Sequence, residues 1–277
     1  MKNFNKIFTI IVLIFLYVPM IVLAVASFNT GSDPAVFKSF TFSNYTALFE
    51  DSTLLRLLLN SIIVAVIASI VSTILGTMAS LGIYSMSPRL RSAYMSVTNI
   101  PMTNPDIVTG VSLALLFAFF GTLMKINNIL GFATLLIAHI TFDLPYVILN
   151  VTPKLHQIDP DLQEAAMDLG CTPAQAFFKV VIHEIMPGII SGALMAFTMS
   201  LDDFVISYFV YGADFITLPV EIYNYTKKPL QPKIYALFTL LFLAILAIMI
   251  IMTVIQSKDS KKGSSRKRSR TYKEVKV

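Results

Sequence analysis

Long apolar stretches separated by short polar segments run through the whole chain. One of them, 185–210, carries two acids, Asp202 and Asp203, and no other charge. Five more contain no charged residue over 17 positions or more: 7–28, 57–88, 107–124, 126–142 and 234–257. Because a helix needs roughly 20 residues to cross the hydrocarbon core of a bilayer, the pattern predicts six transmembrane helices.

Composition agrees with a membrane location. The chain is 56% hydrophobic and only 13% charged, a balance that would leave a water-soluble domain with too few polar residues to cover its core. We therefore expect an all-α integral membrane protein of the cell membrane.

The first apolar stretch has two interpretations. Lys2 and Lys6 precede it, and Ala24-Val25-Ala26 resembles a signal-peptide cleavage site. Its 22 uncharged residues, however, exceed the roughly 7–15 of a signal sequence. We interpret it as a retained anchor, which divides the chain into an N-terminal transmembrane helix (1–28), an extracytoplasmic loop (29–56), the main membrane domain (57–257) and a basic tail (258–277).

The distribution of Lys and Arg predicts the orientation. With six spans both termini lie on one side, and that side holds 15 of the basic residues against 6 on the other. Since cytoplasmic segments are enriched in Lys and Arg, we expect both termini to be cytoplasmic. Nine of the 15 lie in the tail, and without it the two sides are equal. We expect the tail to be disordered and to contact anionic membrane lipid, not nucleic acid.

Little in the sequence indicates chemistry on this chain. The only cysteine is Cys171, and no phosphate-binding loop, zinc-protease helix or serine-hydrolase motif occurs. His139 and Asp143, one helical turn apart, are too few ligands for a metal, and we interpret them as an interior hydrogen bond in place of a proton relay. We expect no catalytic residue, no metal site and no cofactor on this chain.

A polar element interrupts the apolar pattern between 151 and 186. Asp159 and Pro160 have the residue types of a helix N-cap and first turn, and Gly170 suits a left-handed helix end. Between them the apolar residues fall on one face and the acids on the other: Leu162, Ala165, Ala166 and Leu169 against Asp161, Glu164 and Asp168.

A second start signal follows at once. Residues 172–175 form a capping box with proline at the first helical position, and Phe177 begins a new apolar stripe. The pattern predicts two helices of about ten residues outside the bilayer, too short to span it. Their periodicity alone fits either a docking device for another protein or an ordinary connector.

The identities of these residues favour docking. Glu164, Ala165, Ala166 and Gly170, followed by Pro187, resemble the EAA loop of type-1 ABC importer permeases. The resemblance implies the type-1 permease fold, with these four residues in a cytoplasmic coupling helix that enters a cleft of an ATPase. His183 stands where the family often has proline, which predicts a shifted exit from the loop.

Other segments are similar to the permeases of spermidine/putrescine importers: 17–29, 104–113, 137–147 and 197–210. This resemblance implies a subunit that forms half of a polyamine pathway. Its implied partners are an ABC ATPase homodimer, which holds the ATP and Mg, a homologous second permease and an extracytoplasmic polyamine-binding protein.

Three acids are candidates for the pathway. A carboxylate in the bilayer costs several kcal/mol, so Asp202 and Asp203 must face protein, water or a cation, and in a continuous helix adjacent residues point about 100° apart. We expect one of the two to line the pathway, a structural role being the alternative. Asp106 is either a pathway residue or the first-turn acid of a helix. Importers of other solutes such as iron, or an ion-coupled secondary transporter, are the rival functions.

Overall fold

The structure is a computed structural model, and it describes residues 2–31, 36–159, 161–227 and 231–274. Within these residues the chain is helical. The only β-type pairings there are the isolated bridges Asn29–Phe40 and Gly212–Phe215. The backbone divides into two compact units, residues 1–59 with 220–247 and residues 60–219 with 248–277.

The first unit is built from the two ends of the chain. It contains α1 (Lys2–Ala26), α2 (Ser43–Glu50), the first turns of α3 (Ser52–Tyr84), most of α11 (Leu218–Thr226) and the first third of α12 (Pro232–Glu274). Asp51 joins two of these helices, because Lys233 Nζ donates to its Oδ2 at 2.8 Å and the Leu54 amide to its Oδ1 at 3.1 Å. This cap starts α3 at Ser52, earlier than the apolar pattern at 57 predicted.

The described residues of the expected outer loop, 29–56, contain regular structure. Asn29 Oδ1 accepts from the amides of Gly31 and Lys38, at 3.1 and 3.0 Å. The Phe28 and Phe40 rings stack with their centroids 5.1 Å apart. The loop therefore contains a folded turn and a short helix, α2.

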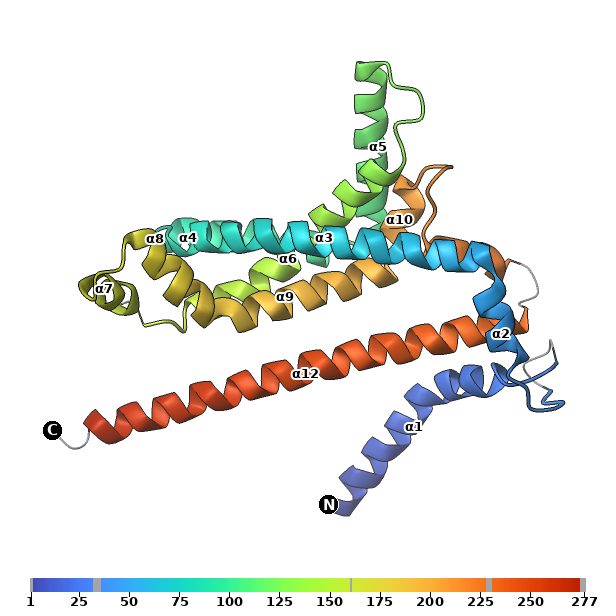
Figure 1. Ribbon diagram of the computed structural model, residues 1–277, viewed down its shortest axis with the longest axis horizontal. Coiled ribbons are helices and arrows are strands. Elements are labelled where there is room, and N and C mark those ends of the chain that lie inside the picture. Colours follow the sequence, from blue (N-terminus) through green and yellow to red (C-terminus); the bar gives the residue numbers. More distant parts are fainter. Residues whose placement is uncertain (1, 32–35, 160, 228–230, 275–277) are drawn as a thin grey trace. The chain divides into compact units, whose positions relative to one another are not determined.

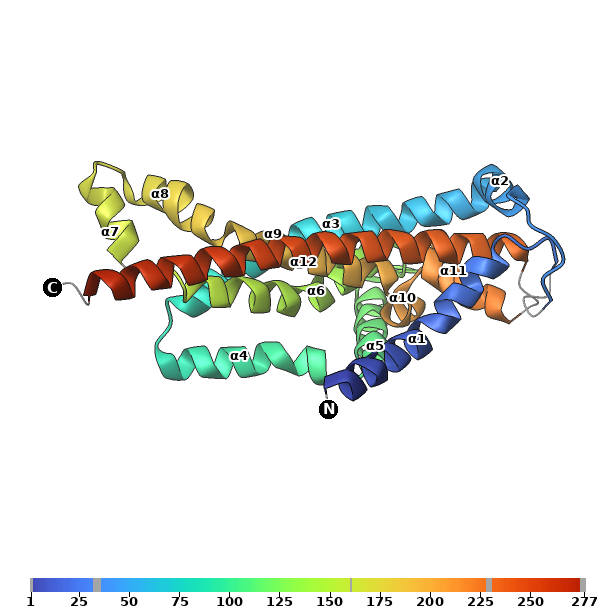
Figure 2. The same ribbon diagram turned by 90° about the horizontal axis from the view of Figure 1, so that it is seen from below.

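The second unit holds the middle of the chain. Its helices are α4 (Pro88–Thr103), α5 (Asp106–Met124), α6 (Phe132–Leu155), α7 (Asp161–Asp168), α8 (Pro173–Ala176), α9 (Ile182–Asp202) and α10 (Val205–Val210), with a π-helical turn (Phe177–Val181) between α8 and α9. Helices α6 and α9 lie side by side along much of their length (Figure 1). Figure 2 shows α3 running alongside them.

Glycines allow three helices of this unit to approach closely. A Cβ built on Gly76 of α3 would lie 2.7 Å from Cβ of Val147, and one on Gly192 of α9 would lie 3.2 Å from its Cα. Val147, on α6, is fully buried between them. The packing of α3, α6 and α9 therefore depends on the missing side chains at 76 and 192.

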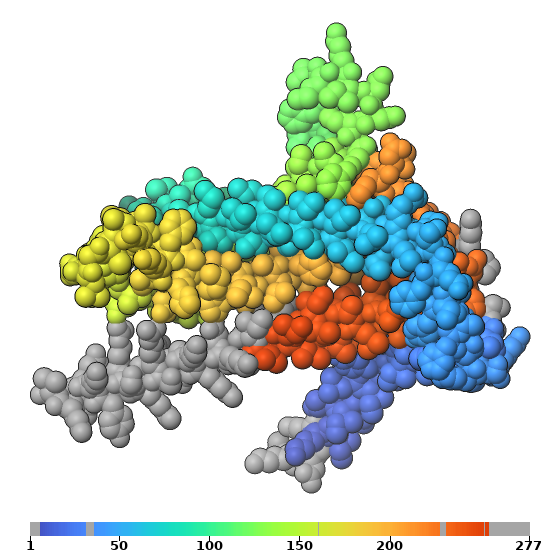
Figure 3. All heavy atoms as spheres, viewed as in Figure 1, coloured from blue at the N-terminus to red at the C-terminus, as the bar shows by residue number. Residues whose placement is uncertain are grey.

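Helix α5 is much less covered. The space-filling view shows it, in green, projecting from the rest of this unit (Figure 3). It packs on α10, yet Leu115 and Phe119 are 67% and 63% exposed. The break before it falls at Asn104 and Pro105, because proline has no amide hydrogen for a continuing helix.

Six helices among the described residues are long and apolar enough to cross a membrane, as predicted. The fifth runs over Pro173–Asp202 in place of 185–210. Helix α12 continues to Glu274, so the tail that we expected to be disordered extends this helix. It contains no proline, and its Lys and Arg are good helix formers. Its expected contact with lipid remains a prediction.

Candidate functional site

Asp203 interrupts the apolar stretch that we expected to form one continuous helix. Helix α9 ends at Asp202 and α10 begins at Val205, and the backbone of Asp203 between them is extended. Its carboxylate accepts from the amides of Ile206, at 3.2 Å, and Ser207, at 2.7 Å. The prediction of continuity was wrong because an Asp side chain can take the backbone donors of a new helix and so favours a helix start.

His139 of α6 ties the two halves of the broken helix together. Its Nδ1 lies 2.6 Å from Oγ of Ser200 on α9, and its Nε2 lies 2.9 Å from Oγ of Ser207 on α10. Ser207 Oγ donates to Asp203 Oδ2 at 2.8 Å, so it accepts from His139. A neutral imidazole with its proton on Nε2 satisfies this network. The predicted interior hydrogen bond is confirmed for His139.

Asp143 has no such partner. It lies one turn after His139 on α6, it is 0% exposed, and neither carboxylate oxygen has a hydrogen-bond partner among the described residues. Nε2 of His139, one turn before it, lies 3.5 Å from Oδ2 of Asp203. The interior hydrogen bond that we expected for Asp143 is therefore absent among the described residues. The two serines bond to His139, and the α10 amides bond to Asp203, so none of these groups is left for Asp143. Among the described residues no group of three potential metal ligands occurs.

The other two candidate acids lie differently. We define the acidic cluster as Asp143, Asp202 and Asp203. Asp202 is the last residue of α9 and is exposed. Asp106 lies in the first turn of α5 and is exposed, which confirms the helix-start interpretation. Asp202 and Asp203 thus lie next to each other, and Asp106 stands apart on another helix.

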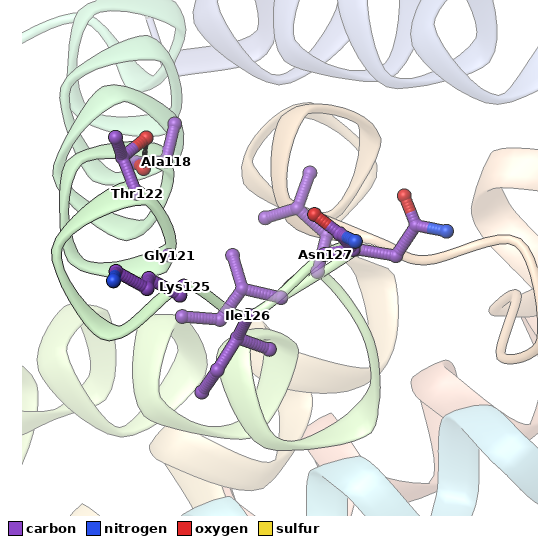
Figure 4. A pocket seen from close by; sticks show the side chains of 9 residues that line it. Ala118, Gly121, Thr122, Lys125, Ile126 and Asn127 are labelled. Atoms are coloured by element: carbon purple, nitrogen blue, oxygen red, sulfur yellow. Dashed lines mark hydrogen bonds between the residues drawn. The ribbon is translucent and has the colours of Figure 1, made fainter.

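The pocket that the structure contains elsewhere has different chemistry. It has a volume of about 680 Å³ and lies at the turn between α5 and α6 (Figure 4). Its lining includes Lys125, Asn127 and Asn128 and no acid. A cationic ligand would meet a positive charge there, so we do not assign the acidic cluster's function to this pocket.

The polar element between 151 and 186 has the predicted caps. Gly170 has a φ of +93°, which L side chains rarely adopt, and it ends α7. Thr172 Oγ1 accepts from the Gln175 amide at 3.3 Å and Gln175 Oε1 from the Thr172 amide at 3.1 Å, which confirms the capping box. Asp159 accepts from the Asp161 amide at 3.3 Å, while Pro160 lies outside the described residues.

The second arm of the element differs from the expected short helix. After α8 the chain passes through the π-helical turn directly into α9, so the arm is the end of a transmembrane helix. His183 and Pro187 both lie within α9, and a shifted exit relative to the family stays a prediction. The second arm continues as a long helix because Phe177, Val181 and Ile185 pack as one apolar row on α6.

The surface of α7 is partly uncovered. Of the family-type residues, Ala166 is buried, whereas Glu164, Ala165 and Gly170 are exposed. Leu169, at 88% exposed, and Phe178, at 68%, add bulk to the same loop. The expected apolar stripe therefore divides: Ala166 anchors α7 to its own unit and Ala165 and Leu169 face outward.

Sequence reasoning missed the role of Arg91. From α4 it donates to carbonyl oxygens at the end of α3, those of Ile83, Tyr84 and Met86, and its Nη1 lies 3.0 Å from Nε2 of His156. His156 caps the end of α6, five residues before α7 begins. Nothing in the local pattern indicates a contact between residues 65 positions apart.

A comparison with known proteins covers both α7 and the acidic cluster. A family model described as "Binding-protein-dependent transport system inner membrane component" matches residues 72–259, more than half of the chain. The chain belongs to this family. The matched part of the permease includes α7, Gly170 and the whole acidic cluster.

Individual relatives of this chain are permeases of polyamine transport systems. The permease is 36% identical over 233 residues to the spermidine/putrescine transport system permease protein PotC of Haemophilus influenzae, covering 84% of this chain and 88% of that protein. It is 36% identical over 227 residues to the putrescine transport system permease protein PotI of Escherichia coli, covering 82% and 81%.

Solved structures show the fold. A chain of a bacterial ABC transporter that imports the acidic polysaccharide alginate superimposes with a TM-score of 0.70 at 14% identity, covering 94% of the permease and 95% of that chain. A chain of the MetNI methionine ABC transporter gives 0.55 at 17% identity, covering 76% and 95%. The predicted type-1 ABC permease fold is thus confirmed.

Proposed function

We propose that this permease forms half of an ATP-driven import pathway for polyamines, and that the acidic cluster is part of the wall. The observation that carries the proposal is a group of carboxylates inside a membrane domain, around the break between α9 and α10. Carboxylates in such a place mark ion or substrate pathways. The relatives named for spermidine and putrescine transport have the same kind of substrate, a flexible chain of ammonium groups.

The break at Asp203 suits such a pathway. Interrupted helices in transporters place polar backbone groups and charged side chains beside the substrate at membrane depth. Here Asp203 is oriented by two amides and the Ser207 hydroxyl, while Asp202 is exposed at the helix end. We assign Asp203 to the fixed structure of the site and Asp202 to direct contact with the substrate. Asp106 contributes negative charge at the start of α5.

The partner ATPase acts on the permease through α7. We propose that Glu164, Ala165, Ala166 and Gly170 dock in an ATPase, that the ATPase is a homodimer holding ATP and Mg, and that no catalysis takes place on this chain. Since α8 continues into α9, a movement of α7 reaches the acidic cluster along one continuous helix. A homologous permease, an external polyamine-binding protein and membrane lipid complete the assembly, with both termini of this chain in the cytoplasm.

Uptake of labelled spermidine by membranes that contain the whole transporter tests the proposal. We expect uptake with ATP and the binding protein, and a strong reduction for Asp202→Asn with normal assembly of the complex. Uptake driven by an ion gradient without ATP would instead indicate a secondary transporter. ATP-driven uptake of another solute such as iron, with none of spermidine or putrescine, would indicate a different ABC importer.

A further inference from the structure

Asp143 is a fully buried acid on α6 that the hydrogen-bond network around His139 leaves out. Neither of its oxygens receives a hydrogen bond from a described residue. Both ring nitrogens of His139, one turn earlier, are already used by serines. Asp203, whose Oδ2 lies 3.5 Å from Nε2 of His139, accepts from backbone amides and from Ser207.

A buried carboxyl group without a partner is costly. Leaving one buried polar group unsatisfied costs about 1–3 kcal/mol, and more if the group is charged. A protein keeps such a group where a ligand or a proton supplies the missing partner. The chemistry that fits a carboxylate beside a second carboxylate is a cation with several N–H donors.

We propose that Asp143 is an additional ammonium-binding subsite of the pathway, occupied as the substrate passes α6. This inference rests on the proposed polyamine function and adds a carboxylate from a helix other than the one that carries Asp202. The subsite is closed in the present conformation, in which Asp143 is 0% exposed, and it opens when α6 moves relative to the helices packed on it.

The subsite should distinguish spermidine from putrescine. Putrescine has two ammonium groups, of which Asp202 can bind one directly while the fixed charge of Asp203 beside it balances the other. Spermidine has three, so one remains for a carboxylate on another helix. Asp143 therefore favours the passage of spermidine over that of putrescine.

Proteoliposomes that contain the complete transporter test this difference. At saturating loaded binding protein and ATP, we expect Asp143→Asn to lower the maximal rate of spermidine uptake about tenfold, the effect of one lost charge-assisted hydrogen bond. Putrescine uptake should change by less than about twofold, below the effect of one hydrogen bond. Asp143→Glu should restore spermidine uptake. Thr141→Ala, on the exposed face of the same helix, is the control and should change the uptake rate of neither polyamine.

A thiol at the same position gives a second readout that does not depend on the asparagine variant folding. Because Cys171 is the only cysteine, Asp143→Cys in a Cys171→Ser background has a single thiol. We expect a charged, water-soluble methanethiosulfonate reagent to label it during ATP turnover, and spermidine to slow the labelling. A purely structural acid would stay unlabelled in every state.

The outcomes separate the two proposals. If the unmodified transporter takes up neither polyamine, the proposed function fails. If it takes up both, and Asp143→Asn preserves their ratio or the thiol is never labelled, the subsite at Asp143 is wrong and the proposed function stands.

Discussion

Arg91 on α4 forms a hydrogen bond with His156 at the end of α6, with 3.0 Å between Nη1 and Nε2. His156 Nδ1 lies 2.8 Å from the Thr152 carbonyl oxygen, to which it donates. Nε2 is therefore the acceptor, and the ring is neutral. The Tyr84 ring of α3 packs edge-on against His156, with centroids 5.2 Å apart, and beneath Arg91. The three helix ends beside the coupling element are thus held by one guanidinium.

We predict that Arg91→Lys loosens this junction. A lysine ammonium is a single point donor and cannot serve the α3 carbonyls and His156 at the same time. The loss of hydrogen bonds from a charged group should destabilise the detergent-solubilised permease by about 1–3 kcal/mol, measured by thermal unfolding. It should also lower uptake per ATP hydrolysed in the complete transporter. Arg89→Lys, exposed on the same helix, is the matched control; an equal loss in both variants would contradict the role of Arg91.

Glycine 76 offers a test of the helix packing. Gly76→Ala places a methyl group 2.7 Å from the Val147 side chain and should cost about 1–3 kcal/mol of stability or force α3 and α6 apart. Gly82, on the same helix, has no atom within 4 Å of an added Cβ. Gly82→Ala should therefore be neutral or raise stability by up to about 1 kcal/mol. Thermal unfolding of both variants decides; equal tolerance would mean that α3 does not pack on α6 at Gly76.

Gly170 tests the importance of the turn after α7. Its φ of +93° suits glycine, so Gly170→Ala should cost about 1–2 kcal/mol locally and misdirect α7. We expect slower ATP hydrolysis by the assembled complex when loaded binding protein is added. Gly170→Asn should retain more activity, because Asn tolerates positive φ better than Ala. The reverse order of these two variants would show that the backbone conformation is not what matters there.

Acid should weaken the contact between Asp51 and Lys233. The hydrogen bond from Lys233, assisted by the Leu54 and Thr53 amides, holds the pKa of Asp51 below its usual value of 3.8, although burial opposes this. Because the folded-state pKa is the lower one, the contribution to stability is complete well above pH 3.8 and disappears as the pH falls through the folded value.

Thermal unfolding of the solubilised permease between pH 6 and pH 3 measures this contribution. Asp51→Asn should be less stable than the unmodified chain at pH 6, and the difference should shrink toward pH 3. Glu50→Gln, exposed next to it, should show no such convergence. A constant difference across the range would exclude the ion pair as its source.

Much of the architecture could be predicted from the sequence because it depends on local sequence patterns. The six spans follow from uninterrupted apolar length, and the caps at Gly170 and at Thr172 follow from residues that act on backbone groups a few positions away. Such interactions need no knowledge of the tertiary fold.

The centre of the acidic cluster could not be predicted in this way. His139 meets serines 61 and 68 positions further along, so neither sequence period nor spacing indicates the contact. The apolar stretch 185–210 predicted one helix through Asp203, whereas the carboxylate of Asp203 starts a new helix. An interior hydrogen bond was expected for Asp143, and only the packing of α6 on α9 and α10 shows that it has no partner among the described residues.

The central claim is that a separate ATPase docks on α7 and drives this permease. In a Cys171→Ser background, Ala165→Cys modified with a photoactivatable crosslinker places the reactive group on the exposed side of α7. In native membranes we predict a crosslinked product that contains the transporter's ATPase, whose yield changes with ATP, and none from Glu50→Cys on α2. Equal capture from both positions, or no ATPase in the Ala165→Cys product, would contradict the account.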